Sequence, residues 1–179
     1  MRADEYFALG ETQDRYELIN GLVVMSPSLR PRHYKIVEAI MRQLEALSRN
    51  SNTYQALDIY VEIDLCLDDL TVYRPDMCVY ARPPFPETPE RLTTPPDFVL
   101  ELLSPGSKAL DLITKRDAYE EFGVKEYIVI NPVDARIWAW ALENGRFAEM
   151  TVEGDRLVSR AFSGFSYDLV PIRERASRK

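Results

Sequence analysis

Three charged residues of the sequence stand in segments that are otherwise apolar. Glu101 lies within Phe98–Leu103, where every other residue is apolar, and Asp76 directly precedes the apolar run 77–80. An ionised carboxylate that is buried without a partner is very costly, so each acid must be neutral, paired with a cation or bound to a metal ion. Lys115 belongs with them, because it shares a helical stripe with apolar residues that should face a sheet. The sequence therefore predicts a buried cluster of two acids and one amine.

This combination of side chains suits the hydrolysis of a phosphodiester bond. Carboxylate oxygens are hard ligands that suit Mg²⁺ or Mn²⁺. Such an ion polarises a phosphoryl oxygen and helps to ionise a water molecule, while a lysine stabilises the charge that builds on the phosphate or orients that water. A second interpretation stays open, in which Lys115 forms a buried ion pair with Asp76 or Glu101 and has no catalytic role. Buried ion pairs are weak devices for stability alone, which favours the site.

Two predicted strands and one predicted helix must position these residues. The strand over Thr71–Tyr80 carries the aspartate, and the nearly all-apolar segment Phe98–Leu103 is typical of a central strand covered on both faces. The lysine lies in a helix predicted over 108–122, with Ser107 as its N-cap and Gly123 as its left-handed C-cap. We expect the two acids to lie on adjacent strands, with the amine above them.

The remaining elements indicate an α/β fold with an N-terminal hairpin and a C-terminal antiparallel meander. The proline-rich segment between the two acids is an extended loop that either borders the site or simply connects the strands. The other predicted elements, in chain order, are a hairpin over 16–25, a helix over 33–48, a strand over 60–68, the loop over 82–96, a buried strand over 127–130, and the meander over 136–142, 147–152 and 157–162.

Length and composition restrict the class of protein. The chain has 179 residues, of which 46% are hydrophobic and 28% charged, so we expect one domain over 1–179. No apolar run approaches the ~20 residues that span a bilayer, the N-terminus lacks the features of a signal peptide, and Cys66 and Cys78 form no paired motif. We therefore expect a cytoplasmic protein. The net charge of −7 counts against non-specific coating of nucleic acid, although it leaves room for a local basic site.

Two basic segments and a pair of tryptophans are further candidates for ligand contact. The segment 30–35 holds two arginines, a histidine and a lysine, and the tail 173–179 holds three arginines and a lysine. The tail is interpreted as a solvated, frayed end. Trp138 and Trp140 share one face of a predicted strand, where they either stack on bases or belong to the core or a dimer interface.

Several short motifs resemble those of a known family in both order and spacing. They are Tyr-Glu-Leu-Ile-Asn-Gly (16–21), Pro-Arg-His (31–33), Arg-Pro-Asp (74–76), Leu-Glu-Leu-Leu-Ser-Pro (100–105), the helix with Asp111, Lys115 and Tyr119, and Gly-Val-Lys-Glu-Tyr (123–127). From Tyr16 to Trp140 the chain resembles the Uma-type family of restriction-endonuclease-like proteins, in the PD-(D/E)XK nuclease superfamily. The resemblance implies a mixed central sheet flanked by helices, with a core over about 16–142.

The resemblance also implies ligands for the metal ion. Asp76 and Glu101 would hold Mg²⁺ or Mn²⁺, with the backbone carbonyl of Leu102 as a further ligand. The superfamily pattern places a lysine two residues after the glutamate, where this chain has Leu103. Lys115 would supply the ammonium from the following helix instead.

Two more positions match the motifs of the family. Glu17 would be an additional acid near the metal; the alternative is an ordinary exposed residue of the hairpin. His33 opens the first long helix beside Arg32 and Lys35, where free backbone N–H groups and the helix dipole favour a phosphate. Its alternative is a solvent-facing residue of the first turn. Because the chain has one histidine, a site of several histidines is excluded.

Together these observations predict a metal-dependent nuclease that hydrolyses DNA through a metal-activated water. We expect a homodimer, because one domain presents one site whereas a duplex has two strands. A hypothesis from another class is a non-catalytic DNA-binding or interaction module that retains the fold, which the acidic composition and Leu103 favour. A third is a structural domain that contains a buried ion pair and nothing more.

Overall fold

The computed structural model describes residues 1–179 except 11–14, 27–30, 83, 86 and 178–179. Within the described residues, the central sheet has six strands: β3 (Asp58–Tyr60), β6 (Met77–Tyr80), β7 (Phe98–Leu102), β8 (Glu126–Ile130), β9 (Ile137–Glu143) and β10 (Arg146–Glu149). Their spatial order is β10-β9-β8-β7-β6-β3. β7 and β8 run parallel, and the other neighbouring pairs are antiparallel. The predicted mixed central sheet is thereby confirmed.

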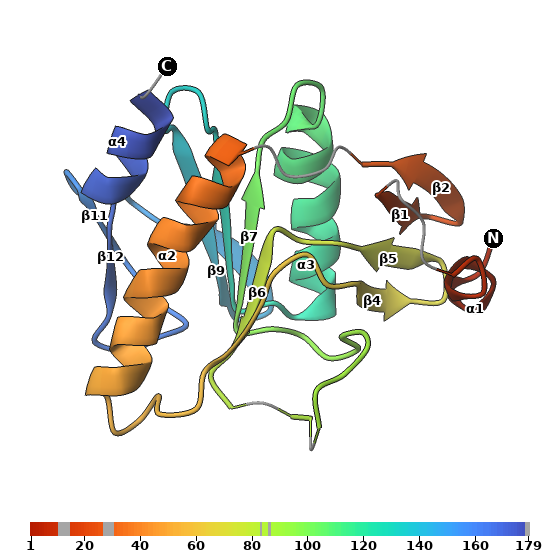
Figure 1. Cartoon of the computed structure of the whole chain (residues 1–179), viewed down its shortest axis with the longest axis horizontal. Helices are drawn as coiled ribbons and strands as arrows, with labels where there is room; N and C mark the ends of the chain where they lie inside the picture. Colours follow the sequence, from red (N-terminus) through yellow and green to blue (C-terminus); the bar gives the residue numbers. More distant parts are fainter. Residues whose placement is uncertain (11–14, 27–30, 83, 86, 178–179) are drawn as a thin grey trace.

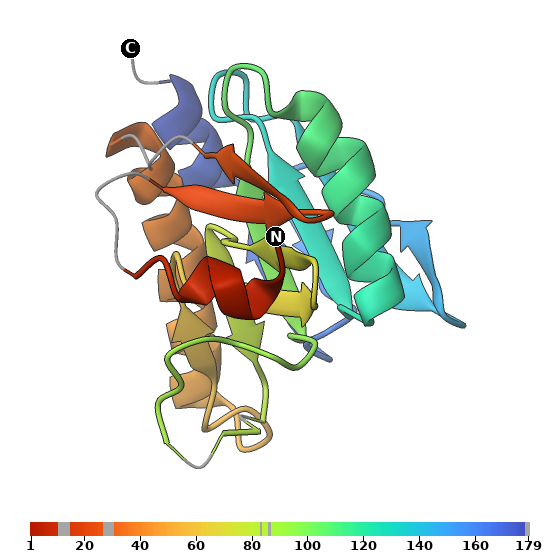
Figure 2. The same ribbon diagram turned by 90° about the vertical axis from the view of Figure 1, so that its right-hand side faces the viewer.

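A second sheet lies beside the first. It contains β1 (Tyr16–Ile19), β2 (Leu22–Met25), β4 (Leu65–Asp68) and β5 (Thr71–Tyr73), in the order β2-β1-β5-β4. The predicted N-terminal hairpin is confirmed: β1 and β2 pair around Asn20 and Gly21, whose φ angles of 50° and 81° suit a tight hairpin turn. Figure 2 shows this hairpin in front of the central sheet, together with the short helix α1 (Ala3–Phe7).

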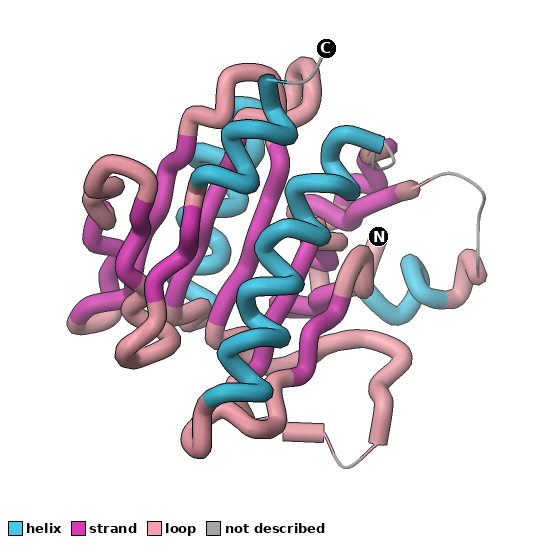
Figure 3. Tube along the Cα trace, turned by 60° about the vertical axis from the view of Figure 1, so that its left-hand side comes forward, coloured by secondary structure: helices cyan, strands magenta, loops and turns pink. Residues whose placement is uncertain are grey.

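Helices cover both faces of the central sheet, as Figure 1 shows. α2 (Pro31–Asn50) and α4 (Val170–Ser177) lie side by side across one face (Figure 3). The π-helical turn η1 (Leu110–Lys115) and α3 (Arg116–Phe122) cover the other. α2 begins at Pro31, two residues before the predicted start, because a proline at the first helical position needs no partner for an N–H. Gly123 ends α3 in the predicted left-handed conformation, with φ at 95°.

The alternation of side chains along β7 decides what faces each helical layer. Phe98, Leu100 and Leu102 pack with residues of α2, whereas Val99 and Leu103 pack with Tyr119 of α3. Since successive side chains of a strand point to opposite faces, Glu101 points toward η1 and α3. The one carboxylate of this strand therefore faces the same layer as Lys115.

Two predicted strands are wrong in extent, because the chain passes from one sheet to the other within them. Thr71–Tyr80 divides into β5 and β6 around Arg74 and Pro75, where the proline lacks the N–H that a continuous ladder needs. The strand predicted over 60–68 is interrupted near Glu62, whose φ is 53°. These breaks place Asp76 at the junction between the two sheets.

The C-terminal part corrects two further predictions. β9 and β10 form the expected antiparallel pair, but β11 (Arg156–Val158) pairs with β12 (Ser166–Asp168) in a separate two-stranded sheet within the described residues. The tail is helical as far as Ser177 rather than frayed, because Ile172 and Ala176 are buried. The predicted tail residues Arg178 and Lys179 lie outside the described residues. No helix in the described part of the chain is long and apolar enough to cross a membrane.

Candidate active site

Asp76 and Glu101 face each other across two antiparallel strands. Met77 pairs with Leu100, and the next position along each strand places Asp76 opposite Glu101. Each residue is 3% exposed. The backbone N–H of Leu102 donates a hydrogen bond to Oδ2 of Asp76 at 2.6 Å. The two acids that the sequence singled out therefore converge, as predicted, on the face of the sheet covered by η1.

Lys115 lies directly above this pair. Its Nζ donates hydrogen bonds to Oε1 of Glu101 at 2.8 Å and to Oε1 of Glu17 at 2.9 Å, and lies 3.8 Å from Oδ1 of Asp111. The side chain is 3% exposed. η1 carries both Asp111 and Lys115 into the interior. π-helical turns of this kind are rare in proteins, and those that occur are often found at functional sites. The predicted inward orientation of Lys115 is confirmed.

Glu17 reaches the same cluster from β1. β1 pairs with β5 at Leu18 and Val72, which brings Glu17 beside the junction between the sheets. Its Oε1 accepts a hydrogen bond from the backbone N–H of Arg74 at 2.8 Å as well as that from Lys115. The residue is buried, so the alternative of an exposed hairpin residue is wrong.

Arg15 belongs to the site although the sequence reasoning missed it. Its Nη1 lies 2.9 Å from Oε1 of Glu62 and 3.6 Å from Oδ1 of Asp76, and its Nη2 donates to the carbonyl of Arg74. Its Nε is buried and has no hydrogen-bond partner among the residues that the structure describes. A signal existed: the two-residue period of a strand places Arg15 on the same side as Glu17.

Asp111, Ser107 and Tyr119 complete the polar network. The Ser107 hydroxyl donates to Oδ2 of Asp111 at 2.6 Å, so its side chain is used differently from the predicted N-cap of the helix. The Tyr119 hydroxyl donates to Oε1 of Glu101 at 3.0 Å. Asp111 was not predicted as a site residue, although its spacing of four from Lys115 signals a shared helix face.

A cavity of about 320 Å³ opens onto these groups. His33, in the first turn of α2, lines it and is 8% exposed, so the alternative of a solvent-facing residue is wrong. Arg30 of the same basic segment lies outside the described residues. The other residues along the cavity are Arg15, Glu17, Val24, Met25, Ser26, Asp76, Glu101, Leu102, Ser104, Pro105, Gly106, Ser107, Leu110, Asp111 and Lys115.

Leu103, which stands where the superfamily has a lysine, is buried in the apolar cluster between the sheet and α3. It shares a face of the sheet with Glu101, two residues away. The ammonium of Lys115 approaches the glutamate from the helix above rather than from this strand. Position 103 therefore contributes packing, and the cation near the acids comes from another element.

Burial and crowding shift the protonation of the cluster. Burial raises the pKa of Asp76 to about 6 and that of Glu101 to about 8, although Arg15 and Lys115 respectively oppose the rise. Burial would also raise the pKa of Glu17, but the ammonium of Lys115, the backbone N–H of Arg74 and the guanidinium of Arg15 together outweigh it and lower that pKa. Burial would lower the pKa of Lys115, yet Glu101 and Glu17 hold it above its ordinary value. The amine is therefore charged and the acids compete for it.

This donor set fits a divalent cation. Four acids and two cations line the cavity, so full ionisation would leave an excess of two negative charges in a buried place. No three His, Cys, Asp or Glu side chains of the described chain lie close enough to hold an ion by themselves. Mg²⁺ commonly uses only one or two carboxylates and keeps several waters. Asp76 and Glu101 match that requirement in chemical type and placement.

The mixed sheet, its helical layers and the acidic cavity at the junction of the strands define a protein with a nuclease fold. A crystal structure titled "putative nuclease belonging to DUF820", from Anabaena variabilis ATCC 29413, superposes with a TM-score of 0.80 at 18% identity, covering 98% of this chain and 99% of that one. The model of the Uma2 family, described as "Putative restriction endonuclease", matches residues 3–172. The chain belongs to the Uma2 family, which confirms the resemblance seen in its motifs. No curated protein matches the sequence.

Proposed function

We propose that this protein is a metal-dependent nuclease that hydrolyses DNA phosphodiester bonds by means of a metal-activated water. The observation that carries the proposal is the convergence of Asp76, Glu101 and Lys115 on one cavity, with Nζ of the lysine 2.8 Å from Oε1 of the glutamate. Membership of a family described as "Putative restriction endonuclease" supports it.

In this proposal Asp76 and Glu101 hold Mg²⁺ or Mn²⁺, and the carbonyl of Leu102 is a further ligand. The hydrogen bond from the N–H of Leu102 to Oδ2 of Asp76 fixes the carboxylate while Oδ1 stays turned toward Arg15. A bound divalent ion would polarise a phosphoryl oxygen and lower the pKa of a water molecule.

The other residues of the cavity act on the phosphate and the proton. Lys115 stabilises negative charge on the phosphate or orients the water, and Glu17 holds the ammonium in position at 2.9 Å. His33, at the N-terminal turn of α2, lines the cavity where it can donate a hydrogen bond to a phosphate oxygen. Two copies acting as a homodimer would cut both strands of a duplex, each with one site.

The test is a nicking assay on supercoiled plasmid with Mg²⁺ or Mn²⁺. Wild-type protein should convert the plasmid to open circles, and Asp76→Ala should not. Glu126→Gln is a matched control, because Glu126 is also a buried acid on the central sheet but faces the opposite helical layer, bound to Ser159 and Tyr167. Activity of the wild type equal to that of Asp76→Ala would sink the proposal.

A non-catalytic DNA-binding module is the second candidate. The observation in its favour is that Glu101, the central acid, is already occupied by Lys115 and Tyr119 while Leu103 supplies no lysine from the strand. Calorimetric titration with Mn²⁺ separates the two candidates. The nuclease should bind Mn²⁺ in a manner that Glu101→Gln abolishes, whereas the module should show no such dependence.

A further inference from the structure

A second cavity adjoins the candidate active site at the carboxyl ends of β7 and β8. Its volume is about 470 Å³, and it shares His33, Ser104 and Pro105 with the acidic cavity. β7 and β8 are parallel neighbours, and α/β sheets commonly bind ligands in the crevice outside the carboxyl ends of such strands. A ligand lying in the acidic cavity can therefore extend directly into the second one.

The two cavities differ in charge. Four acids line the first, whereas the described residues along the second include Arg32 and Lys108 and no acid. This is notable in a chain with a net charge of −7. Apolar groups form much of the remaining wall, among them Pro132 and Val133, the latter 69% exposed. Cations combined with apolar contact suit a nucleotide, whose phosphate is anionic and whose sugar and base are largely apolar.

The ring of Trp138 contacts two cations, one of which, Lys108, lines this cavity. The Nζ of Lys108 lies 5.9 Å and the guanidinium carbon of Arg136 4.8 Å from the centroid of its ring. Such cation–π contacts hold flexible side chains in place while leaving their N–H groups available. Trp140, by contrast, is buried and stacks on Tyr127 at 5.7 Å, so it belongs to the core. The two tryptophans of one strand therefore have different roles.

We propose that this second cavity, with Lys108 and Arg136, binds the backbone phosphates of DNA next to the scissile phosphate. In this arrangement the DNA strand runs from the acidic cavity past His33 and across the carboxyl ends of β7 and β8. The inference rests on the proposed nuclease function, and it identifies the cations that an acidic protein needs to hold a polyanion near four carboxylates. It assigns the contacts to two exposed side chains that the sequence did not single out.

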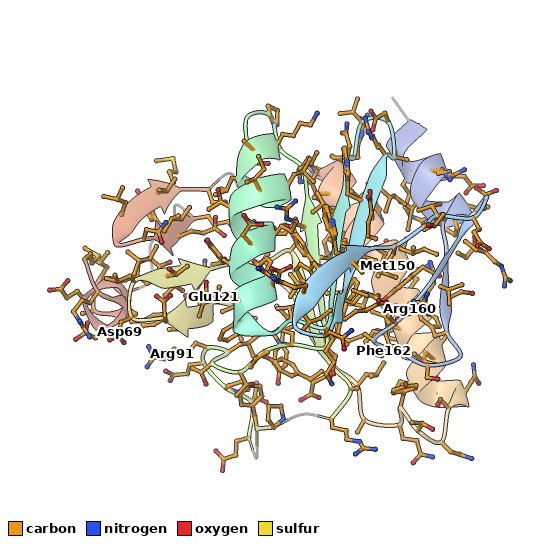
Figure 4. The ribbon with its side chains drawn as sticks, turned by 180° about the vertical axis from the view of Figure 1, so that it is seen from behind. Asp69, Arg91, Glu121, Met150, Arg160 and Phe162 are labelled. Atoms are coloured by element: carbon orange, nitrogen blue, oxygen red, sulfur yellow. The ribbon has the colours of Figure 1, made fainter. Side chains whose placement is uncertain are left out.

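The experiment measures binding of a fluorescein-labelled DNA duplex by fluorescence anisotropy over a range of salt concentrations, with EDTA present. The slope of log K against log salt is negative, and for Lys108→Ala/Arg136→Ala its magnitude should fall by roughly 1.8, because each phosphate contact contributes about 0.9. The charge-conserving pair Lys108→Arg/Arg136→Lys should keep the wild-type slope. Arg156→Ala/Arg160→Ala removes the same charge from exposed positions, Arg156 in β11 and Arg160 away from α3 (Figure 4), and should also keep the wild-type slope.

The outcomes separate this inference from the nuclease proposal. Equal slopes for the two alanine pairs, or no DNA binding by the wild type at low salt, would overturn the subsite. A reduced slope for Lys108→Ala/Arg136→Ala without cleavage by the wild type in any divalent ion supports the subsite and contradicts the nuclease. Cleavage by the wild type together with an unchanged slope for Lys108→Ala/Arg136→Ala supports the nuclease and overturns the subsite. Circular dichroism of each variant verifies that it is folded.

Discussion

Replacement of Lys115 by methionine removes a buried cation and keeps most of the side-chain volume. The ammonium is 3% exposed and bonds to Glu101 and Glu17 at 2.8 and 2.9 Å, so its loss leaves both carboxylates without their closest cation. Breaking a buried ion pair in this way costs about 3–5 kcal/mol of unfolding free energy. For a chain of this size the melting temperature should fall by about 6–20 °C in EDTA.

A divalent ion should reverse much of that loss. Without Lys115 the excess negative charge of the cavity grows by one, so Mn²⁺ should raise the melting temperature of Lys115→Met more than that of the wild type. A ligand present at 100 times its Kd stabilises the folded state by about 2.7 kcal/mol. The nicking activity of the variant should nevertheless be lost, because Arg15, the other cation of the described cavity, pairs with Glu62 and Asp76 and does not take the place of the ammonium at Glu101. Thermal unfolding followed by circular dichroism, with EDTA or Mn²⁺, measures both effects.

Lys35→Met is the matched control for this experiment. Lys35 is a surface residue, with a side chain that is 62% exposed and a partner, Glu38, three residues away. Its replacement should change the unfolding free energy by less than about 0.5 kcal/mol. If Lys115→Met proved as stable as Lys35→Met and indifferent to Mn²⁺, the cluster would be a dispensable ion pair and the electrostatic argument would be refuted.

Three further variants test the surroundings of the cluster. Burial raises the pKa of Glu101 from 4.5 to about 8, so the folded protein binds more protons than the unfolded chain and its stability falls as pH rises through that range. Glu101→Gln cannot ionise and should lose less stability over the same range in urea unfolding; a parallel loss would contradict the shift. Tyr119→Phe removes the hydroxyl that donates to Glu101 at 3.0 Å and should cost about 1–3 kcal/mol in urea, with Mn²⁺ binding retained in calorimetry. Glu126→Gln should lower the unfolding free energy by a similar amount, because the carboxylate of Glu126 accepts hydrogen bonds from Ser159, Tyr167 and two backbone N–H groups. The variant protein should still bind Mn²⁺, and loss of that binding would show that the two faces of the sheet are coupled.

The sequence predicted the central acids and amine because each conflicts with its local setting. Glu101 interrupts an apolar strand, Asp76 precedes another, and Lys115 lies on the apolar stripe of a helix. Burial of a charge demands a partner, so these conflicts by themselves indicate a cluster. Asn20-Gly21 and Gly123 were predictable for a similarly local reason, since their backbone conformations favour these residues.

Tertiary structure decided how the other residues join this cluster. Arg15 occupies a polar stretch where an exposed position would be equally acceptable, so no local conflict marked it. Asp111 stands between Leu110 and Leu112, but only the fold shows that its carboxylate meets Ser107 and Lys115. Glu17 meets Lys115 across a separation of 98 residues, a contact that depends on the pairing of β1 with β5 and on the passage of the chain between two sheets at Pro75. Periodicity reports which side of an element is buried, whereas the register and junction of sheets determine which buried sides meet. The chemical types in the site are therefore local information, and their assembly into one cavity is a property of the whole fold.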